Sequence, residues 1–332
     1  MRPPTGLRTA RDDDADGLIA LVAAAYAEHP GCVLDLPGVD ADLEDPATTA
    51  ARRGGRWWVV ERDGRIVATV GSGPLEDDGS LELKRLYVDR DVRRQGLASG
   101  LVRWVEAHAA GLGATTVQLW SDTRFEEAHR LYTRLGYQAS GEERDLHDPS
   151  HTTEWRFVRD VTPAWPRRTV TWDGPDGHDT CHLTDLPDGA VLAGTVGDVA
   201  YRVEIDAAWR TRVAEVTDAT GRRRLHADGE GRWWRGGREA PELAGCVDVD
   251  IEVTPATNTL PIRRVGGDLG VGDAVEVTAA WMRVPGPDIV ALRQRYLRTA
   301  PDAWSYGGAD GWSLTVDDDG LVVVYGDLWS RA

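Results

Sequence analysis

Apolar positions in the first half of the chain follow two different spacings. Two amphipathic helices are predicted where apolar residues share one helix face, first at Leu18, Leu21, Val22 and Ala25 and again at Leu97, Leu101, Trp104 and Val105. Runs of strand composition alternate with these helices, at residues 57–61, 66–70, 81–88, 116–120 and 153–158. This alternation predicts a mixed α/β domain.

The spacing changes after Pro163 and Pro166, which interrupt the pattern. From there apolar residues recur at every second position, as in segment 199–206 and segment 246–253, and residues 312–316 and 321–325 continue this strand pattern. Segment 287–300 fits either a helix or a strand. The sequence therefore predicts an α+β protein with two domains, residues 1–162 and an all-β domain of residues 163–332.

Charge and composition restrict the possible functions. The chain has 332 residues and a formal net charge of -17, and so acidic a protein is not expected to bind nucleic acid, because phosphate contacts need a positive face. No apolar window has the length of a membrane span and no signal peptide is recognisable, so a cytoplasmic protein without a transmembrane segment is expected. Cys32, Cys181 and Cys246 lack paired spacing, which predicts buried free thiols and no metal site.

The segment "VRRQGLASG", residues 92–100, is a candidate anion site. Gly96 and Gly100 bracket the first turn of the second predicted helix, where unpaired backbone N–H groups would face a ligand, and Arg93 and Arg94 add positive charge. An ordinary strand-to-helix turn explains the glycines equally well. In the preceding strand the apolar positions change from odd to even numbers, which predicts a β-bulge near Lys84 or Arg85.

Residues 6–160 resemble the GNAT acetyltransferases. The segment "LYVDRDVRRQGLASGLVRWVEAHA" is similar to the coenzyme A signature of that family at Arg93, Gly96 and Ala98, and "TVQLWSDTRFEEAHRLYTRLGYQ" is similar to its next strand and helix. The resemblance implies that backbone N–H groups of residues 94–98 bind the pyrophosphate of acetyl-CoA, while the bulged strand pairs with its pantetheine arm. The implied coenzyme residues are Leu86, Tyr87, Val88, Arg93, Arg94, Gln95, Gly96, Leu97, Ala98 and Ser99.

Tyr132 has two interpretations. It lies on the apolar stripe of its predicted helix, as a core tyrosine would, but the resemblance implies that it protonates the departing thiolate of coenzyme A. The family often has asparagine seven positions earlier, where this sequence has Phe125. An amine acceptor also needs a proton acceptor, and Glu82 and Asp122 are the candidates, although either could be a solvated or helix-capping residue.

Residues 165–332 resemble a family known as putative glycolipid-binding, chiefly through "DVDIEVTPATNTLPIRR" at residues 248–264. The resemblance implies a long curved sheet, a half-barrel like that of lipoprotein carriers, around an apolar cavity for a glycolipid or fatty-acyl ligand. A new strand is expected to begin with Arg263 and Arg264, which would then face opposite sides. Candidate ligand-binding residues chosen from the residues alone are Asn258, Arg263, Arg264, Trp209, Arg212, Gln294 and Tyr296.

Two functions of different classes follow from these features. The first is an acetyl-CoA-dependent N-acetyltransferase in which a primary amine of a small molecule attacks the thioester directly, fused to a glycolipid-binding module. The alternative is a non-catalytic binding protein that carries an amphiphile and whose first domain only senses coenzyme A.

Overall fold

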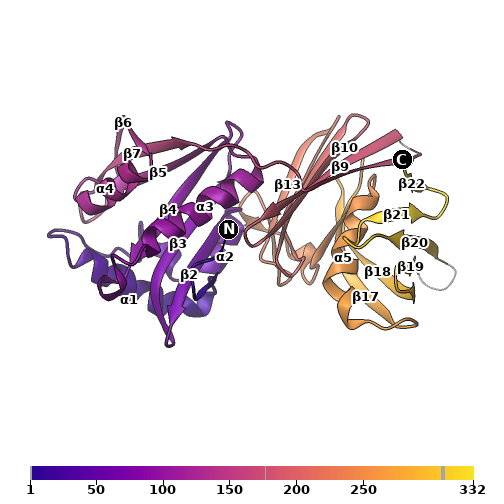
Figure 1. Cartoon of the computed structure of the whole chain (residues 1–332), viewed down its shortest axis with the longest axis horizontal. Helices are drawn as coiled ribbons and strands as arrows, with labels where there is room; N and C mark the ends of the chain where they lie inside the picture. The colour runs from indigo at the N-terminus through magenta and orange to yellow at the C-terminus, as the bar shows by residue number, and fades with distance from the viewer. Residues whose placement is uncertain (1, 176, 308–310) are drawn as a thin grey trace. The chain divides into compact units, whose positions relative to one another are not determined.

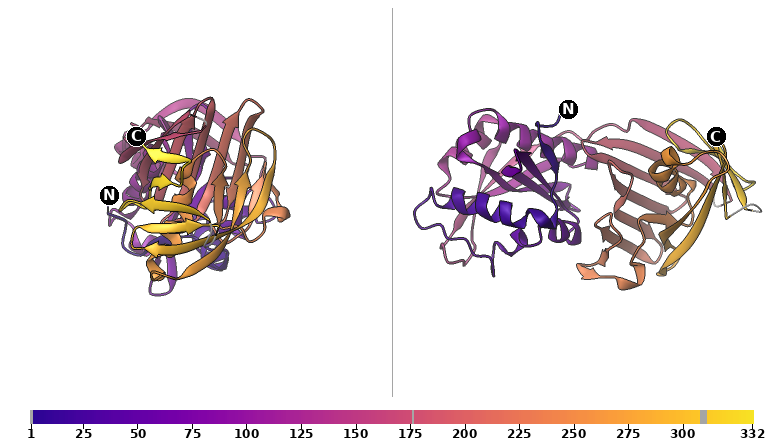
Figure 2. Two further views of the ribbon diagram at one scale, coloured as in Figure 1. Left: turned by 90° about the vertical axis from the view of Figure 1, so that its right-hand side faces the viewer. Right: turned by 90° about the horizontal axis from the view of Figure 1, so that it is seen from below.

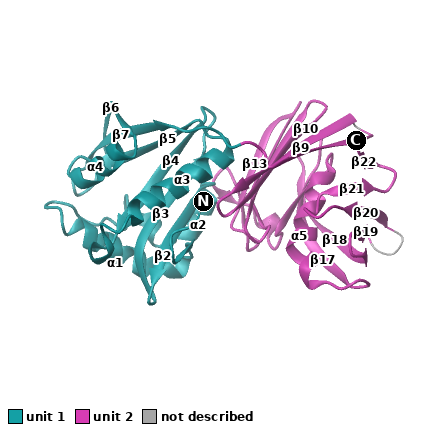
Figure 3. Ribbon diagram, viewed as in Figure 1, with its two compact units in different colours: residues 1–164 teal, residues 165–332 magenta. Residues whose placement is uncertain are grey.

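The protein was analysed as a computed structural model that describes residues 2–175, 177–307 and 311–332. It divides into two compact units, residues 1–164 and residues 165–332, which Figure 3 shows in two colours. Each unit contains one sheet, of seven strands in the first and of fifteen in the second. The α+β architecture is therefore confirmed, and the two units are described separately below.

The first unit is a mixed sheet with helices (Figure 1). Its strands have the order β1-β2-β3-β4-β5-β7-β6, and only β4 and β5 are parallel neighbours. The predicted helices and strands are all present, whereas β1, α2 and β6 have no counterpart in the sequence prediction. The bounds are β1 (Leu7–Thr9), α1 (Ala15–Tyr26), α2 (Pro46–Arg52), β2 (Arg56–Arg62), β3 (Arg65–Leu75), β4 (Ser80–Val88), α3 (Leu97–Leu112), β5 (Thr116–Asp122), α4 (Glu126–Arg134), β6 (Gln138–Asp145) and β7 (Thr153–Asp160).

Helices cover both faces of this sheet because β2 is apolar on both sides. Trp57 and Val59 pack in one cluster with Leu18 and Val22 of α1. Trp58 points to the opposite face, where its ring lies 6.4 Å from that of Trp104 on α3. Side chains alternate along a strand, so this doubly apolar run specifies a sheet between two helical layers.

Strand β6 forms one edge of the first sheet, and every one of its residues is exposed. Its register against β7 shifts between Ala139 and Glu143, and Gly141 adopts a positive φ of 84° within this bulge. The strand has no apolar face, so it offered no periodic pattern for a sequence prediction.

The second unit is a large, mostly antiparallel sheet (Figures 1 and 2). Its order is β15-β14-β13-β12-β11-β10-β9-β8-β22-β21-β20-β19-β18-β17-β16, with β16 and β17 parallel, so the sheet ends at β15 and β16 and is not a closed barrel. The bounds are β8 (Arg168–Gly174), β9 (Gly177–Leu186), β10 (Gly189–Val196), β11 (Val199–Asp206), β12 (Thr211–Asp218), β13 (Gly221–Ala227), β14 (Trp233–Arg235), β15 (Arg238–Glu239), β16 (Asp248–Ile251), α5 (Thr259–Val265), β17 (Ala274–Met282), β18 (Ile289–Ala300), β19 (Ala303–Tyr306), β20 (Trp312–Val316), β21 (Val322–Tyr325) and β22 (Trp329–Arg331).

The main core of the second unit is filled by its own large side chains. Trp172 and Trp233 are fully buried in it, and their indole N–H groups donate to the carbonyl oxygens of Val322 and Cys246 at 2.7 Å. Both tryptophans therefore have packing and hydrogen-bonding partners, as buried indoles require.

The prediction that a strand begins at Arg263 and Arg264 is wrong. Residues 259–265 form helix α5, preceded by a short 3-10 helix at Pro255–Asn258. Pro261 is compatible with this helix because it lies in the first turn, where its missing N–H has no intrahelical acceptor. Segment 287–300, which fitted either element, contains strand β18.

A buried carboxylate joins distant parts of the second unit. Asp179 on β9 is 0% exposed and accepts hydrogen bonds from the hydroxyls of Tyr201 at 2.9 Å and Thr254 at 2.5 Å. Burial raises the pKa of Asp179 to about 6. The protonated form is favoured by folding, so the stabilisation from this group is present below the unfolded pKa and is lost as the pH rises through about 6.

We predict that Asp179→Asn removes this pH dependence, because asparagine stays neutral and keeps a carbonyl acceptor for Tyr201 and Thr254. When the pH rises from 4 to 7, the unfolding free energy of wild type should fall relative to that of the variant by up to roughly 3 kcal/mol. Urea unfolding at both pH values measures it. A difference independent of pH would contradict the assignment.

Candidate functional site

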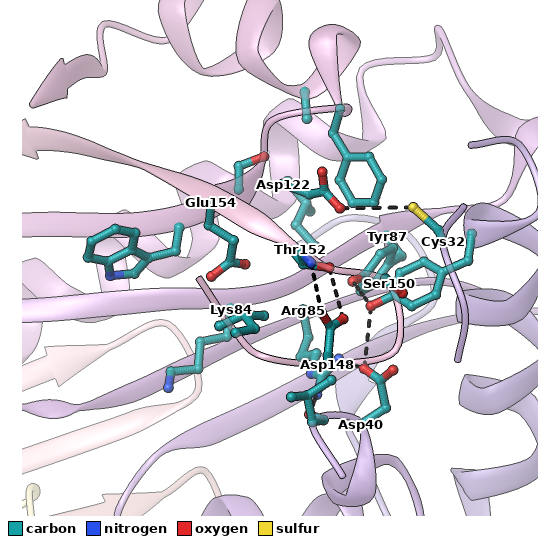
Figure 4. A pocket seen from close by; sticks show the side chains of 18 of the residues that line it. Cys32, Asp40, Lys84, Arg85, Tyr87, Asp122, Asp148, Ser150, Thr152 and Glu154 are labelled. Carbon is teal, nitrogen blue, oxygen red and sulfur yellow. Dashed lines mark hydrogen bonds and ion pairs between the residues drawn. The ribbon is translucent and has the colours of Figure 1, made fainter. Parts of the chain in front are cut away.

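The first unit contains a cavity of about 360 Å³ between β4 and β5. These parallel strands pair only from Ser80 with Thr116 to Glu82 with Gln118. Beyond that point the cavity lies between them and is lined by residues 82–87 of β4 and residues 120–122 of β5. Figure 4 shows side chains from both strands and from the loop before β7 pointing into it. The divergence of the two strands therefore creates the site.

The predicted β-bulge forms one wall of the cavity. Lys84 pairs with Gly71 of β3 but Tyr87 pairs with Thr69, so β4 has one extra residue, and Arg85 adopts a positive φ of 52°. The bulge turns the Arg85 guanidinium toward the loop after α1. There it pairs with Asp40 at 2.6 Å and Asp42 at 2.5 Å.

Two tyrosine hydroxyls extend this network. Tyr26 of α1 lies 3.2 Å from the hydroxyl of Tyr87 and donates to Asp40 at 3.3 Å. Burial raises the pKa of both tyrosines. Both hydroxyls therefore stay protonated at neutral pH and fix the position of the bulged strand.

The loop between β4 and α3 presents unpaired backbone donors. Within the described residues, the N–H groups of residues 94–99 have no backbone or side-chain acceptor, and Gly96 at the start of α3 has a φ of 79°. A Cβ built on Gly96 would meet no heavy atom within 4 Å. The unpaired amides therefore lie at the positive end of a sixteen-residue helix, beside the open space at Gly96, which is the arrangement that binds an anion.

The two arginines of this loop have different environments. Arg93 is occupied by the protein itself, because its guanidinium donates to both Glu28 oxygens at 2.7 Å and to the Val88 carbonyl at 3.0 Å. Arg94 is exposed and has no ion pair among the residues that the structure describes. Arg93 therefore positions the loop, whereas Arg94 is available to a ligand.

Tyr132 lies on α4 and lines the cavity. It is 5% exposed, its ring lies 5.8 Å from that of Phe157, and burial raises its pKa. Its hydroxyl makes no hydrogen bond in the described part of the chain. Tyr132 is thus both a packed core residue and a protonated donor at the cavity.

Three carboxylates line the cavity near Tyr132 and differ in their partners. Glu82 pairs with Lys84 at 3.1 Å, and Asp122 is held by Arg124 at 2.6 Å. Asp122 also accepts the backbone N–H of Arg124, and α4 begins only at Glu126, so Asp122 shapes the turn before that helix. The third carboxylate, Glu154 on β7, was missed by the sequence prediction.

Glu154 has the electrostatics of a proton acceptor. Burial raises its pKa, and although Arg144 opposes this at 2.7 Å, the charges of Glu82 and Asp122 raise the pKa further. In Figure 4 its carboxylate lies between Asp122 and Lys84. Glu154 and Trp155 are adjacent on β7 and so face opposite sides of the sheet, which could have indicated that Glu154 faces the cavity. The ion-pair partner of Glu154, Arg144, could not be found in this way, because it lies on the unpredicted strand β6.

Sequence reasoning also missed a polar group at the far end of the cavity. Asp148 accepts from the N–H and hydroxyl of Thr152 at 2.7 and 2.8 Å, and these bonds lower its pKa despite burial. Cys32 is only partly buried and lies 3.9 Å from Asp122, so the prediction of a buried thiol is wrong there. Cys181 and Cys246 are buried, and all three thiols are free.

The ligand-binding candidates of the second unit have partners within that unit. Gln294 donates a hydrogen bond to Asp250 at 2.5 Å, and the Tyr296 hydroxyl donates one to Asn258 at 2.9 Å. Arg264 pairs with Asp248 at 2.5 Å.

The other candidates make different contacts. Arg263 is exposed, and its guanidinium lies 4.9 Å from the ring centroid of Trp209. Arg212 donates to the Asp228 carbonyl. Each of the seven candidates therefore already contacts another residue of the second unit.

Two general features of the described residues bear on function. No helix among them is long and apolar enough to span a lipid bilayer. The described ranges also contain no group of three or more histidine, cysteine or acidic side chains placed to hold a metal ion.

Comparisons with known proteins identify both units. Residues 22–137 match the acetyltransferase (GNAT) family, and residues 169–331 match the family described as "Putative glycolipid-binding". N-acetyltransferase 8 of Rattus norvegicus is 42% identical over 94 residues, which are 27% of this chain and 42% of that protein. The chain thus spans less than half the length of that curated relative. The two family resemblances of the sequence are confirmed.

Two solved structures are similar to one unit each. A DUF1089 family protein of Pseudomonas aeruginosa has 30% identity and a TM-score of 0.39, over 52% of this chain and 94% of its own. A PaiA N-acetyltransferase of Thermoplasma acidophilum, solved in complex with coenzyme A, has 11% identity and a TM-score of 0.38, over 47% of this chain and 98% of its own.

Proposed function

We propose that this chain, in which residues 22–137 belong to the GNAT acetyltransferase family and residues 169–331 to the family described as putative glycolipid-binding, is an acetyl-CoA-dependent N-acetyltransferase with an attached glycolipid-binding module. The observation that carries the proposal is the cavity between the diverging strands β4 and β5, which Tyr132 lines. The unpaired amides at the start of α3 would extend this site into one path.

The coenzyme would follow this path. The N–H groups of residues 94–99 and the guanidinium of Arg94 would bind the pyrophosphate, since both supply positive charge without a competing acceptor. Leu86, Tyr87 and Val88 would pair with the pantetheine arm where β4 has left β5. Arg93 would act indirectly, by holding the loop to Glu28.

The reaction would be a direct attack of the amine nitrogen on the thioester carbonyl. The acceptor ammonium first loses one proton to give the neutral amine. The C–N bond then forms as the C–S bond breaks, the nitrogen loses a second proton, and the sulfur gains one. Tyr132 would donate to the sulfur because its raised pKa keeps the hydroxyl protonated. Glu154 would accept the amine proton, because its raised pKa makes it more basic than an ordinary glutamate.

We propose a supporting role for the other two carboxylates. The charges of Asp122 and Glu82 raise the basicity of Glu154 and would attract a cationic amine, while Arg124 and Lys84 hold the two carboxylates in place. The acceptor would be the primary amine of a small molecule.

The second unit would bind the polar end of a glycolipid. Its sheet would curve as a half-barrel, since Thr211 of β12 hydrogen bonds with Val247 and Val249 beside β16, eleven places away in the strand order. The core around Trp172 and Trp233 is occupied by protein side chains. The three free thiols favour a reducing compartment, the cytoplasm.

Gly96→Glu should abolish coenzyme A binding measured by calorimetry, because it places a carboxylate where the pyrophosphate would sit. Gly113→Glu is the matched control, since Gly113 ends the same helix with a φ of 87° and an equally open Cβ position. Both variants carry the same backbone strain of roughly 1 kcal/mol. Equal affinity of the two variants would contradict the assignment of the loop.

Tyr132→Phe should lower kcat by roughly 10- to 10⁴-fold with little change in coenzyme binding, because the hydroxyl acts mainly in the transition state. Thioester consumption with a panel of amines measures the rate. Tyr137→Phe is the control, because Tyr137 is also buried and lies 5.9 Å away but does not line the cavity. No consumption by wild type with any amine would favour the coenzyme-sensing alternative.

Glu154→Gln should remove the acidic limb of the pH profile of kcat/KM. In wild type the rate should fall as the pH drops through the raised pKa of Glu154, because only the carboxylate accepts a proton. Glu82→Gln and Asp122→Asn should keep the limb and shift it to lower pH. A limb lost in Glu82→Gln but kept in Glu154→Gln would make Glu82 the base.

A further inference from the structure

Four aromatic side chains form a continuous row on β18 to β21 of the second unit. In order they are Tyr296, Tyr306, Tyr325 and Trp312, and adjacent ring centroids are 5.3, 6.1 and 6.3 Å apart. The last two pairs meet edge to face, with interplanar angles of 85° and 87°. We call this set the aromatic row.

The aromatic row leads from the interior to the surface. Tyr296 is 2% exposed, Tyr306 and Tyr325 are partly buried, and Trp312 is 47% exposed. Trp312 lies directly against Gly326, where a Cβ would meet an indole carbon at 2.7 Å. The absence of a side chain at Gly326 thus makes room for the indole, which still keeps nearly half of its surface open to solvent.

A polar group accompanies the buried end of the row. The carboxylate of Asp250 accepts from Gln294 at 2.5 Å and from the hydroxyl of Thr257 at 3.4 Å. Burial and then the charge of Asp250 raise the pKa of Tyr306 to about 12, and the same charge contributes to the raised pKa of Tyr296 and Tyr325. The charge of Asp250 therefore acts on all three phenols.

The tyrosine hydroxyls and the Asp250 carboxylate can form more hydrogen bonds than the protein supplies. Tyr296 already donates to Asn258. Among the described residues, the Tyr325 hydroxyl has no hydrogen-bond partner, and a carboxylate has about four acceptor sites, of which Asp250 uses two. A ligand with several hydroxyl groups could donate to Asp250 and exchange hydrogen bonds with the phenols.

We propose that the aromatic row, together with Asp250 and Gln294, binds the sugar ring of a glycolipid, which deepens the proposed function of the second unit and rests on it. A sugar ring has a C–H face that packs on an aromatic ring and hydroxyls that pair with carboxylates and amides. Trp312 supplies the ring at the surface, and Asp250 and Gln294 supply the polar partners inside.

The full-length chain is titrated with two amphiphiles of equal chain length, octyl β-glucoside and octyl tetraethylene glycol, each below its micelle concentration. Calorimetry of wild type should show at least about tenfold tighter binding of the glucoside. Trp312→Ala and Asp250→Asn should each weaken glucoside binding about tenfold or more, with little effect on the sugar-free probe. Tyr325→Phe, which removes only one hydroxyl, should weaken it less.

Trp281→Ala is the matched control, because Trp281 lies on β17 of the same unit, outside the row and against Arg283. It should bind the glucoside as wild type does. Equal binding of both probes by wild type would overturn the sugar site. A glucoside preference that survives Trp312→Ala and Asp250→Asn would overturn this site and leave the glycolipid function standing, whereas no binding of either probe would overturn both.

Discussion

The candidate active site depends on the ion pairs that the Arg85 guanidinium forms. It lies at the bulge of β4, and by pairing with Asp40 and Asp42 it ties that strand to the loop after α1. Asp40 is 1% exposed, so the pair is buried on at least one side. Loss of one partner of a buried pair typically costs about 3–5 kcal/mol, because a charge is then left without compensation. The ion pairs therefore hold the bulge in place, and the bulge forms one wall of the cavity.

Much of this site could be predicted because it follows from periodic patterns. The change of phase between Leu83 and Leu86 indicated the bulge, and the glycines before α3 indicated the unpaired amides. The misses have a common physical cause. Strand β6 is exposed at every residue and so has no apolar period, which hid Arg144, and the carboxylates at 40 and 42 belong to a loop whose place in space is set by tertiary contacts. Around α5, Pro255, Pro261 and the adjacent arginines suggested a strand, because no helical stripe is visible in seven residues.

Two buried carboxylates of the second unit differ from those around the cavity of the first unit in their partners, although Asp248 of the second unit does pair with Arg264. In the first, five of the six carboxylates that line the cavity have arginine or lysine partners. In the second, Asp179 and Asp250 accept from neutral hydroxyl and amide groups, and burial raises the pKa of each to about 6. Neutral partners orient a carboxylate without cancelling its charge, so this arrangement retains a strong acceptor at a cost in stability.

The bulged, fully exposed strand β6 has a consequence for how molecules of this protein meet one another. A flat edge strand with free N–H and C=O groups is a template for intermolecular β-pairing and aggregation. Strand β6 carries glutamates and an arginine and is interrupted at Gly141, while β15 in the other sheet has only two residues, Arg238 and Glu239. Charge and irregularity at β6 and shortness at β15 all disfavour the addition of a foreign strand at these two edges.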